Sequence, residues 1–269
     1  YVIFVDNAST DGSAGFVKEA YRRKIKNRQL VVVENGRNYG FAEGNNIGIR
    51  IALSDRKTGY VAVLNNDTEA HKEWIEELVK AANRDKKIGS VASKILDFKK
   101  RNVVDTCGIM LYADCIGSGR GYGEYESNYG TAEEVFGAYG AAAFYKREML
   151  EDTKLGEDFF DSEYFTFQEE LDLSWRAQLR GWKCVLAPEA KIFHIGSGTF
   201  QHMAKKGKYL LERNSIFTIV KNLQPELLQY CLPRIILYQA ISLPFYMING
   251  QFFAVIKGRM HGVLNAGKF

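Results

Sequence analysis

Short apolar runs and longer amphipathic stretches alternate over the first hundred residues. The short runs, each typical of a buried strand, are 2–5, 30–33 and 60–64. The longer stretches, whose apolar side chains recur at helical spacing, are 16–21, 45–53 and 73–82. Strands and helices that alternate in this way predict an α/β domain with a mostly parallel, Rossmann-like sheet and helices on both faces.

Polar clusters follow the first and third of these strands. They read DNASTDGS from Asp6 and NNDT from Asn65. Ligands bind outside the carboxyl ends of the strands in such sheets, so both clusters are candidate binding tips. A carboxylate flanked by amides, as Asp67 is, suits Mg²⁺ or Mn²⁺ and the phosphates that such a cation bridges. The same residue types also form plain turns, so both interpretations stay open at this point.

The chain between residues 97 and 198 is less regular. Residues 97–135 are rich in Gly and Tyr and predict a surface excursion without helices. A strand of small residues that enters a helix follows at 137–150. The pattern then predicts a helix closed by Gly181 and a pair of short strands broken by Pro188.

Two clusters in this region could carry chemistry. Glu169, Glu170 and Asp172 either complement the positive end of a helix dipole or include a base whose pKa neighbouring carboxylates raise. His194 is either a structural histidine or an imidazole ligand beside a metal-bound diphosphate.

Charge and cysteine content narrow the class of protein. The net charge of +4 is spread over 269 residues without a polybasic tail, so nucleic acid is not the expected partner. Four cysteines without CxxC spacing predict free thiols in a reducing compartment. The sequence opens inside a strand without Met, so we expect that part of the fold precedes Tyr1.

The last forty residues change in character. No residue between Arg234 and Lys257 is charged, and the stretch is long enough to span a bilayer at about 20 residues. Polar and helix-breaking residues divide it, which favours helices that lie on a membrane surface or pack on the domain. We therefore divide the chain into a domain at 1–222 and an apolar helical extension at 223–269.

Six short motifs follow one another along the chain, and their order identifies the family that the sequence resembles. They are VDNASTDGS, NYGFAEGNNIGI, VLNNDT, GAYGAAAFYKREML, FFDSEYFTFQEELDLSWR and PEAKIFHIGSGT. In this order they resemble the family 2 glycosyltransferases, and most closely the rhamnosyltransferase-like branch, over residues 1–222. The resemblance implies a GT-A fold, a nucleotide-diphospho-sugar donor such as dTDP-rhamnose, Mg²⁺ or Mn²⁺, and inversion at the anomeric carbon.

The resemblance also assigns roles to single residues. Asp6, with Asn7 beside it, matches the aspartate that contacts the nucleotide base, and Asn45 matches a position lining the donor pocket. Asn65, Asn66 and Asp67 take the place of the DXD motif, with Asp67 as its metal ligand. His194 matches a histidine near the diphosphate.

Two features depart from the family pattern. The pair that usually supplies an aspartate base reads Glu169-Glu170 here, which makes Glu170 the expected base and Asp172 the alternative. The resemblance also implies a first strand that is not among these residues, and we expect it to precede Tyr1. The resemblance implies transfer of a sugar to a glycan or lipid-linked acceptor in cell-surface or cell-wall polysaccharide synthesis. The expected location is cytoplasmic, peripheral at the inner face of the cell membrane. The alternative is a non-catalytic relative that binds nucleotide sugar.

Overall fold

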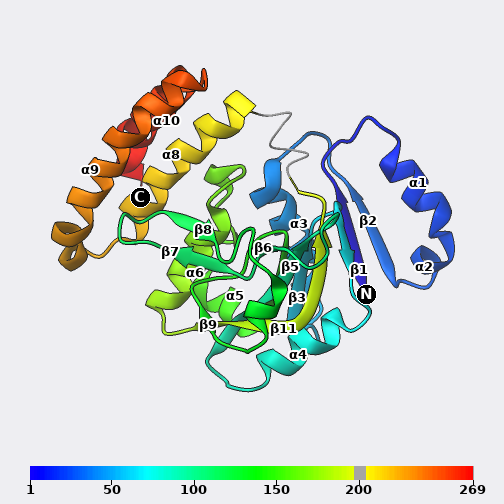
Figure 1. Cartoon of the computed structure of the whole chain (residues 1–269). Coiled ribbons are helices and arrows are strands. Elements are labelled where there is room, and N and C mark those ends of the chain that lie inside the picture. Colours follow the sequence, from blue (N-terminus) through cyan, green and yellow to red (C-terminus); the bar gives the residue numbers. More distant parts are fainter. Residues whose placement is uncertain (197–203, 269) are drawn as a thin grey trace.

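The computed structural model describes residues 1–196 and 204–268 (Figure 1). The strands are β1 Val2–Asp6, β2 Leu30–Glu34, β3 Tyr60–Leu64, β4 Thr68–Ala70, β5 Ile88–Asp97, β6 Val104–Thr106, β7 Ile109–Leu111, β8 Gly117–Gly119, β9 Glu134–Val135, β10 Ala142–Lys146 and β11 Lys183–His194. The α-helices are α1 Ser13–Ala20, α2 Arg22–Lys26, α3 Gly40–Ser54, α4 Trp74–Ala82, α5 Arg147–Thr153, α6 Glu169–Leu179, α8 Ala204–Asn222, α9 Pro225–Ile248 and α10 Phe252–Asn265. Short 3₁₀ turns lie at Glu126–Tyr129, Ser162–Tyr164 and Ala266–Lys268.

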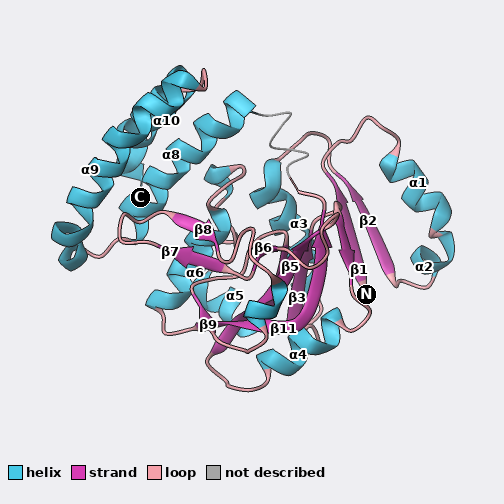
Figure 2. Cartoon of the chain, viewed as in Figure 1, coloured by secondary structure: helices cyan, strands magenta, loops and turns pink. Residues whose placement is uncertain are grey.

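The largest sheet has the strand order β3-β10-β5-β11-β4, with β6 on β5 and β9 on β11 (Figure 2). The strands β3, β5 and β11 run in one direction, because β5 and β11 pair in parallel and β10 lies antiparallel between β3 and β5. A separate two-stranded sheet pairs β1 and β2 in parallel. Residues 97–135 contain the short strands β6 to β9 and no α-helix, as the Gly-rich sequence predicts.

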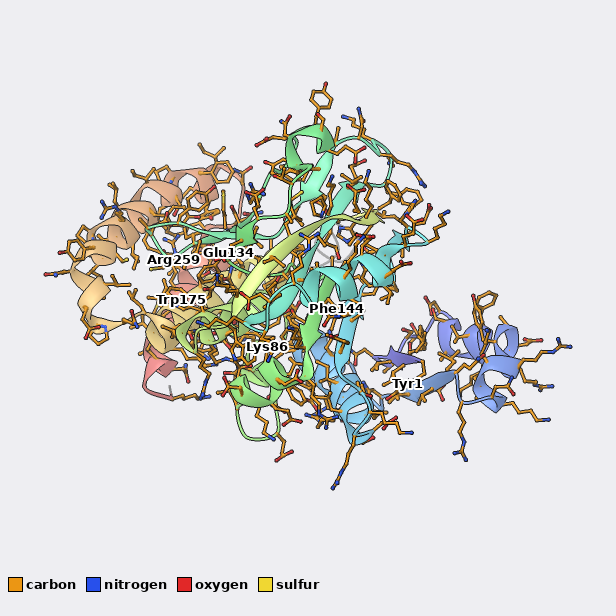
Figure 3. The ribbon with its side chains drawn as sticks, turned by 90° about the horizontal axis from the view of Figure 1, so that it is seen from below. Tyr1, Lys86, Glu134, Phe144, Trp175 and Arg259 are labelled. Carbon is orange, nitrogen blue, oxygen red and sulfur yellow. The ribbon has the colours of Figure 1, made fainter. Side chains whose placement is uncertain are left out.

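The β1–β2 sheet lies at one end of the molecule, opposite the helices α8 to α10 (Figures 1 and 3). Within the described residues, no ladder joins β1 to β3. The helix α3 connects the two sheets, because Gly48 packs on Val5 of β1 while Ile49 joins the core around Val63 of β3.

Helices cover both faces of the large sheet, as predicted. On one face α3, α5 and α6 pack on Ala143 and Tyr145 of β10. On the other face α4 packs on the alternate residues Ala142 and Phe144. The strand β10 is thus buried on both faces, which explains why it lacks an alternating apolar and polar pattern.

Two element boundaries differ from the sequence prediction. The helix α3 begins at Gly40, not near Asn45, because its glycines serve close packing: a Cβ on Gly40 would lie 2.2 Å from the carbonyl oxygen of Phe165. The expected pair of strands around Pro188 is one strand, β11, whose pairing register shifts between Ala187 and Lys191. A bulge accommodates the proline that we took for a break.

The C-terminal helices form a layer of their own. The helix α10 packs along α8 through two glycines: a Cβ on Gly258 would lie 2.5 Å from the Tyr209 carbonyl oxygen, and one on Gly262 would lie 2.8 Å from Ile216 Cβ. Inside the layer, Glu212 pairs with Lys208 at 3.0 Å and with Arg259 at 2.8 Å. All four cysteines are free thiols, as expected.

Candidate active site

The N-terminus of α3 lies between the two predicted binding tips. Asn7, directly after β1, donates from Nδ2 to the Gly40 carbonyl at 2.8 Å. The next residue, Phe41, lies against Gly140, whose absent Cβ would stand 3.0 Å from the Phe41 ring. The same loop accepts the Asn65 backbone N–H through the Ala141 carbonyl at 2.9 Å. The carboxyl ends of β1 and β3 therefore open on the same region, as the α/β pattern predicts.

Asp67 and His194 are brought together by the strand pair β4–β11. Thr68 opposes His194 in that ladder, and the Ile195 N–H donates to the Asp67 carbonyl at 3.0 Å. Asp67 Oδ1 lies 3.4 Å from His194 Nε2, and His194 Nδ1 lies 2.7 Å from Asp105 Oδ2. Burial lowers the pKa of His194, but the Asp105 and Asp67 carboxylates outweigh burial and raise it above its usual value.

The residues around Asp67 fit a divalent cation that a diphosphate helps to hold. Asp67 Oδ1 is buried, and its contact with His194 Nε2, at 3.4 Å, is longer than an ordinary charge-assisted hydrogen bond, which is costly for a carboxylate oxygen. Asp105 can hold the proton on His194 Nδ1, so that Nε2, which lies 3.4 Å from Asp67 Oδ1, would coordinate a cation in exchange for its own proton. Across the described residues, no group of three His, Cys, Asp or Glu side chains forms a complete cage. One carboxylate, one imidazole and substrate phosphates are the ligand set that an oxygen-preferring metal accepts at such a site.

Glu169 and Glu170 begin α6, which points its N-terminus toward the same loop. Burial, then the Glu170 charge, raise the pKa of Glu169 well above its usual range. Burial also raises the pKa of Glu170, although the N–H groups of Glu170 itself and of Gly140 oppose the shift. Each carboxylate keeps one buried oxygen that accepts no hydrogen bond in the described structure. Glu170 is therefore a desolvated carboxyl group beside Phe41 and Gly140.

The alternative base, Asp172, has a different environment. Its side chain is fully buried and pairs with Arg176 at 2.9 Å, Lys221 at 3.0 Å and the Asn222 amide at 2.9 Å. These contacts direct it along α6 and toward α8, and they engage both carboxylate oxygens. The geometry gives Asp172 a structural role in holding α6 on α8.

The remaining donor-pocket candidates are arranged around the α3 N-terminus. Asp6 is buried and accepts the Ser9 N–H at 3.0 Å. Asn45 donates to the Phe41 carbonyl one turn earlier, Asn65 is half-buried, and Asn66 is exposed. The nucleotide-binding roles of these residues stay predictions. Residues 197–199 of the IGSGT motif lie outside the described part of the chain.

Three residues near the site were missed by the sequence analysis. Asp105 is remote from every motif in the sequence. Tyr139 has its pKa raised by burial and then by the Glu170 and Asp105 charges, which links the two halves of the site. Asn46 is fully buried in α3 and binds the backbone of Phe160 from both its amide oxygen, at 2.9 Å, and its amide nitrogen, at 2.7 Å. Two of them had a sequence signal: Asn46 is an amide placed inside a helix beside Asn45, and Tyr139 lies in the motif GAYGAAAFYKREML.

Two solved structures are similar to this chain. One is GalNAc-T7 with UDP, GalNAc and Mn²⁺, with a TM-score of 0.59 and 15% identity, covering 81% of this chain and 41% of that chain. The other is the mannosyltransferase PcManGT from Pyrobaculum calidifontis with GDP-Man and Mn²⁺, with a TM-score of 0.54 and 15% identity, covering 97% and 77%. At such identity the likeness shows the fold alone, and it confirms the predicted GT-A fold.

Sequence comparison adds the family. The low-salt glycan biosynthesis hexosyltransferase Agl10 of Haloferax volcanii is 34% identical over 76 residues, which are 28% of this chain and 22% of that protein. The matched stretch thus spans about a fifth of that relative, and this chain spans less than half of the GalNAc-T7 chain. Residues 1–153, more than half of the chain, match the family described as glycosyl transferase family 2. The chain belongs to glycosyl transferase family 2.

Proposed function

We propose that this protein is a metal-dependent, inverting glycosyltransferase that moves a sugar from a nucleotide-diphospho-sugar to a hydroxyl acceptor. The observation that carries the proposal is a pair of desolvated acids whose surroundings Tyr139 links. Asp67 presents a buried oxygen 3.4 Å from His194 Nε2, and Glu170 presents a buried oxygen without a hydrogen bond beside Gly140. Mn²⁺ and nucleotides in the similar structures are in keeping with this assignment.

In the proposed mechanism, Asp67 and His194 hold the cation and Glu170 acts on the acceptor. A bound Mg²⁺ or Mn²⁺ supplies Lewis-acid stabilisation of the leaving nucleotide diphosphate. Glu170 accepts the proton of the acceptor hydroxyl while that oxygen attacks the anomeric carbon, which inverts its configuration in one displacement. A raised pKa makes Glu170 a stronger base than an exposed glutamate, so activity should fall as the pH drops through that raised value.

The proposal is tested with Asp67→Ala and Glu170→Gln in the complete protein. Each should lower kcat/KM by about 10²-fold or more, because each removes a group that acts on the reacting centre. The control for Glu170→Gln is Glu157→Gln, which makes the same substitution at an exposed glutamate and should leave sugar transfer unchanged. If Asp67→Ala and Glu170→Gln transfer sugar as well as the unmodified protein does, the proposal is wrong. Nucleotide-sugar binding without any transfer by the unmodified protein would instead support the non-catalytic alternative.

The resemblance to the rhamnosyltransferase-like branch extends the proposal to the donor and the acceptor. We infer that the donor is dTDP-rhamnose and that the acceptor belongs to a cell-surface polysaccharide or its lipid-linked precursor. A panel of nucleotide sugars, scored by thermal stabilisation with and without Mn²⁺, distinguishes dTDP-rhamnose from UDP- and GDP-linked sugars. Preferential stabilisation by another nucleotide would overturn the donor assignment.

We further propose that the α9–α10 pair attaches the protein to the inner face of the cell membrane. Among the described residues, α9 is the helix that is long and apolar enough to cross a membrane, and only 6% of its most apolar 18-residue stretch is buried. It is tied to the rest of the protein through α10, however: Arg259 pairs with Glu212 of α8 and donates to the Gln239 carbonyl and to Ser242 Oγ, both at 2.8 Å, in the middle of α9.

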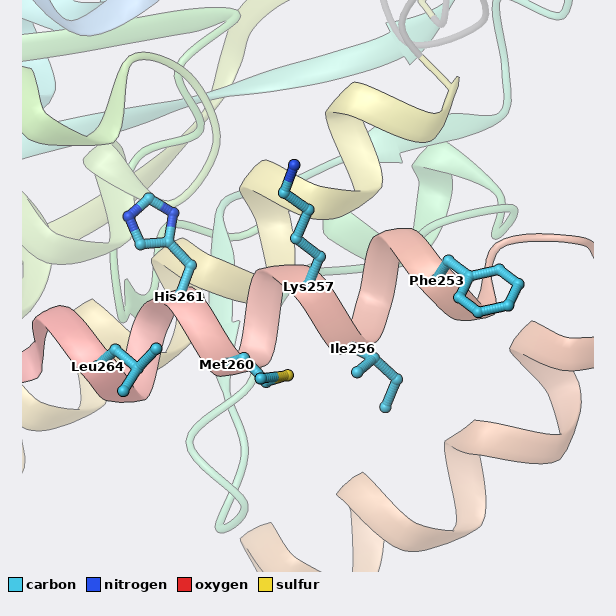
Figure 4. Close-up of a pocket in the computed structure, with 6 residues that line it drawn as sticks. All are labelled: Phe253, Ile256, Lys257, Met260, His261 and Leu264. Carbon is cyan, nitrogen blue, oxygen red and sulfur yellow. The ribbon is translucent and has the colours of Figure 1, made fainter.

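This packing favours an α9 that lies flat on the membrane over one that spans it. Because Arg259 binds the middle of α9 and Lys208 Nζ lies 4.2 Å from the centroid of the Tyr246 ring in α9, a spanning position would draw the buried Lys208–Glu212–Arg259 group into hydrocarbon. The outward side chains are instead apolar and exposed: Ile236, Leu237, Ile241, Phe245, Ile248, Phe253, Met260 and Leu264. Figure 4 shows Ile256 and Met260 below the α10 ribbon and Lys257 and His261 above it, and these four side chains line one pocket with Phe253 and Leu264. Such a face suits insertion into one leaflet.

A further inference from the structure

A buried amide on α8 grips the loop that leads to the candidate base. Asn214 is fully buried. Its Nδ2 lies 2.9 Å from the carbonyl oxygens of Tyr164 and Thr166 and 2.7 Å from that of Phe167. Its Oδ1 accepts a hydrogen bond from Arg213 Nε at 2.8 Å. The amide therefore has a fixed orientation, with its nitrogen directed at three backbone carbonyls of one short loop.

The gripped loop has an unfavourable backbone conformation. Phe165, Phe167 and Gln168 have φ angles of +66°, +72° and +76°, in the region that favours glycine. Non-glycine residues persist there only when the surrounding structure over-determines them. Gln168 is the residue before Glu169 and Glu170, so this backbone path sets the direction in which α6 starts.

The other side of the loop is held by α3. The Ala42 N–H donates to the Phe165 carbonyl at 3.2 Å, and Gly40 leaves room for that carbonyl. Arg213 adds a second contact from α8, because its Nη2 donates to the carbonyls of Glu163 and Tyr164 at 2.8 and 3.0 Å. The loop is thus clamped between the helix beside the donor-pocket candidates and the helix that carries the C-terminal layer.

We propose that Asn214, supported by Arg213, is a positioning residue for Glu170. The clamp holds Phe165–Gln168 in its strained path, and this path places the Glu170 carboxylate beside Gly140 and the acceptor. The inference rests on the proposed function of Glu170 as the base. It assigns to α8 a role in the reaction although α8 supplies no group to the reacting atoms. A general base must lie within hydrogen-bond reach of the proton that it takes, so a loosened loop should slow proton transfer.

The test compares two buried amides on the same helix. Asn214→Ala removes the clamp, and Asn222→Ala removes the amide that binds Asp172 two turns away. We expect Asn214→Ala to lower kcat by about 10²-fold, as small displacements of reacting groups do, with little change in the KM for the donor. Amide hydrogen exchange in residues 163–168 should become faster in Asn214→Ala only. Asn222→Ala should lower the melting temperature comparably and keep most of kcat.

A second variant keeps the test decisive if Asn214→Ala does not fold. Arg213→Lys keeps the charge but cannot reach Glu163, Tyr164 and Asn214 together, so kcat should fall by about tenfold with faster exchange in the same loop. The positioning role is overturned if every folded variant at 213 and 214 matches Asn222→Ala in kcat and loop exchange while Glu170→Gln is inactive. If Glu170→Gln is itself fully active, the proposed function fails instead.

Discussion

At the scale of single residues, His194 shows how a partner far along the chain defines a candidate ligand. Asp105, 89 positions earlier, contacts His194 Nδ1 at 2.7 Å. A carboxylate in this position fixes the tautomer and orientation of a ligating imidazole. Asp105 thus explains why Nε2, and not Nδ1, is directed at Asp67.

This arrangement predicts the effect of Asp105→Asn. The variant should bind Mn²⁺ about 10- to 100-fold more weakly, because the imidazole loses the group that orients it. Titration of Mn²⁺ in the presence of a nucleotide diphosphate, followed by thermal stabilisation, measures the change. Asp97→Asn is a suitable control, since the Asp97 carboxylate accepts hydrogen bonds from the N–H groups of Lys99 and Lys100 in an exposed turn. Equal Mn²⁺ affinities in the two variants would contradict the role given to Asp105.

Glu169 allows a prediction about stability and pH. Its pKa in the folded protein is raised well above that of a free glutamate, by burial first and by Glu170 second. The folded state therefore binds the proton more tightly than the unfolded chain does, so stability is highest below the ordinary glutamate pKa. It decreases as the pH rises through the folded-state pKa.

The neutral variant Glu169→Gln should remove this dependence. We expect it to melt at a higher temperature than the unmodified protein at pH 8, by a few degrees if the gain is about 1 kcal/mol. The difference should vanish near pH 4.5, where both side chains are neutral. Melting curves from pH 4.5 to 8 measure it, and a variant that is less stable at pH 8 would show that the ionised carboxylate has a stabilising partner.

At the scale of elements, the sequence predicted most helices and strands because their apolar side chains follow simple periods. The helix at 73–82 and the strand–helix pair at 142–153 appear close to their expected positions. The misplaced start of α3 and the unbroken β11 have a common cause. In a local sequence pattern, Gly and Pro usually mark the end of a helix or strand. Here Gly40 instead allows α3 to approach Phe165 closely, and Pro188 lies in a bulge within β11. Contacts between distant segments decided both outcomes.

Glycine also decides how α10 sits on α8. Gly258→Ala would place a Cβ 2.5 Å from the Tyr209 carbonyl oxygen, and that backbone atom cannot move without shifting the helix. We expect a loss of about 1–3 kcal/mol in the free energy of unfolding. Gly267→Ala, with nothing within 4 Å of the new atom, should have little effect. Chemical denaturation of both variants measures the difference, and an unchanged midpoint for Gly258→Ala would show that the helices can separate without cost.

At the scale of the whole molecule, the candidate site depends on segments that only the fold brings together. Asp67 and His194 were found from sequence because each lies at a strand end in a recognisable motif. Asp105 and Asn214 were not, because the first contacts His194 across a gap of 89 residues and the second serves a loop about 50 residues earlier. Periodicity predicts which face of an element is buried, whereas a single polar contact between remote segments leaves no periodic trace.

The outer face of α9 and α10 lies at the opposite end of the molecule from the β1–β2 sheet (Figure 1), and it allows the membrane proposal to be tested apart from catalysis. Phe253, 86% exposed, and Ile241, 66% exposed, should both enter the lipid. Because burying such a side chain contributes about 1.5–3 kcal/mol, Phe253→Glu or Ile241→Glu should weaken binding to anionic vesicles by at least about tenfold. Transfer to a soluble acceptor should be unchanged.

The control for this experiment is Ile75→Glu on α4. Ile75 is also exposed, at 47%, so the variant makes the same change in charge and in apolar character. It lies on α4, which packs on the large sheet at Ala142 and Phe144 and does not belong to the α9–α10 face. Co-sedimentation with vesicles should separate the three variants: Ile75→Glu pellets like the unmodified protein, and the other two stay in solution. If all three pellet equally, the α9–α10 face does not hold the membrane. If all three lose binding equally, added negative charge alone accounts for the effect, and an electrostatic attraction of the whole basic protein would replace insertion as the explanation.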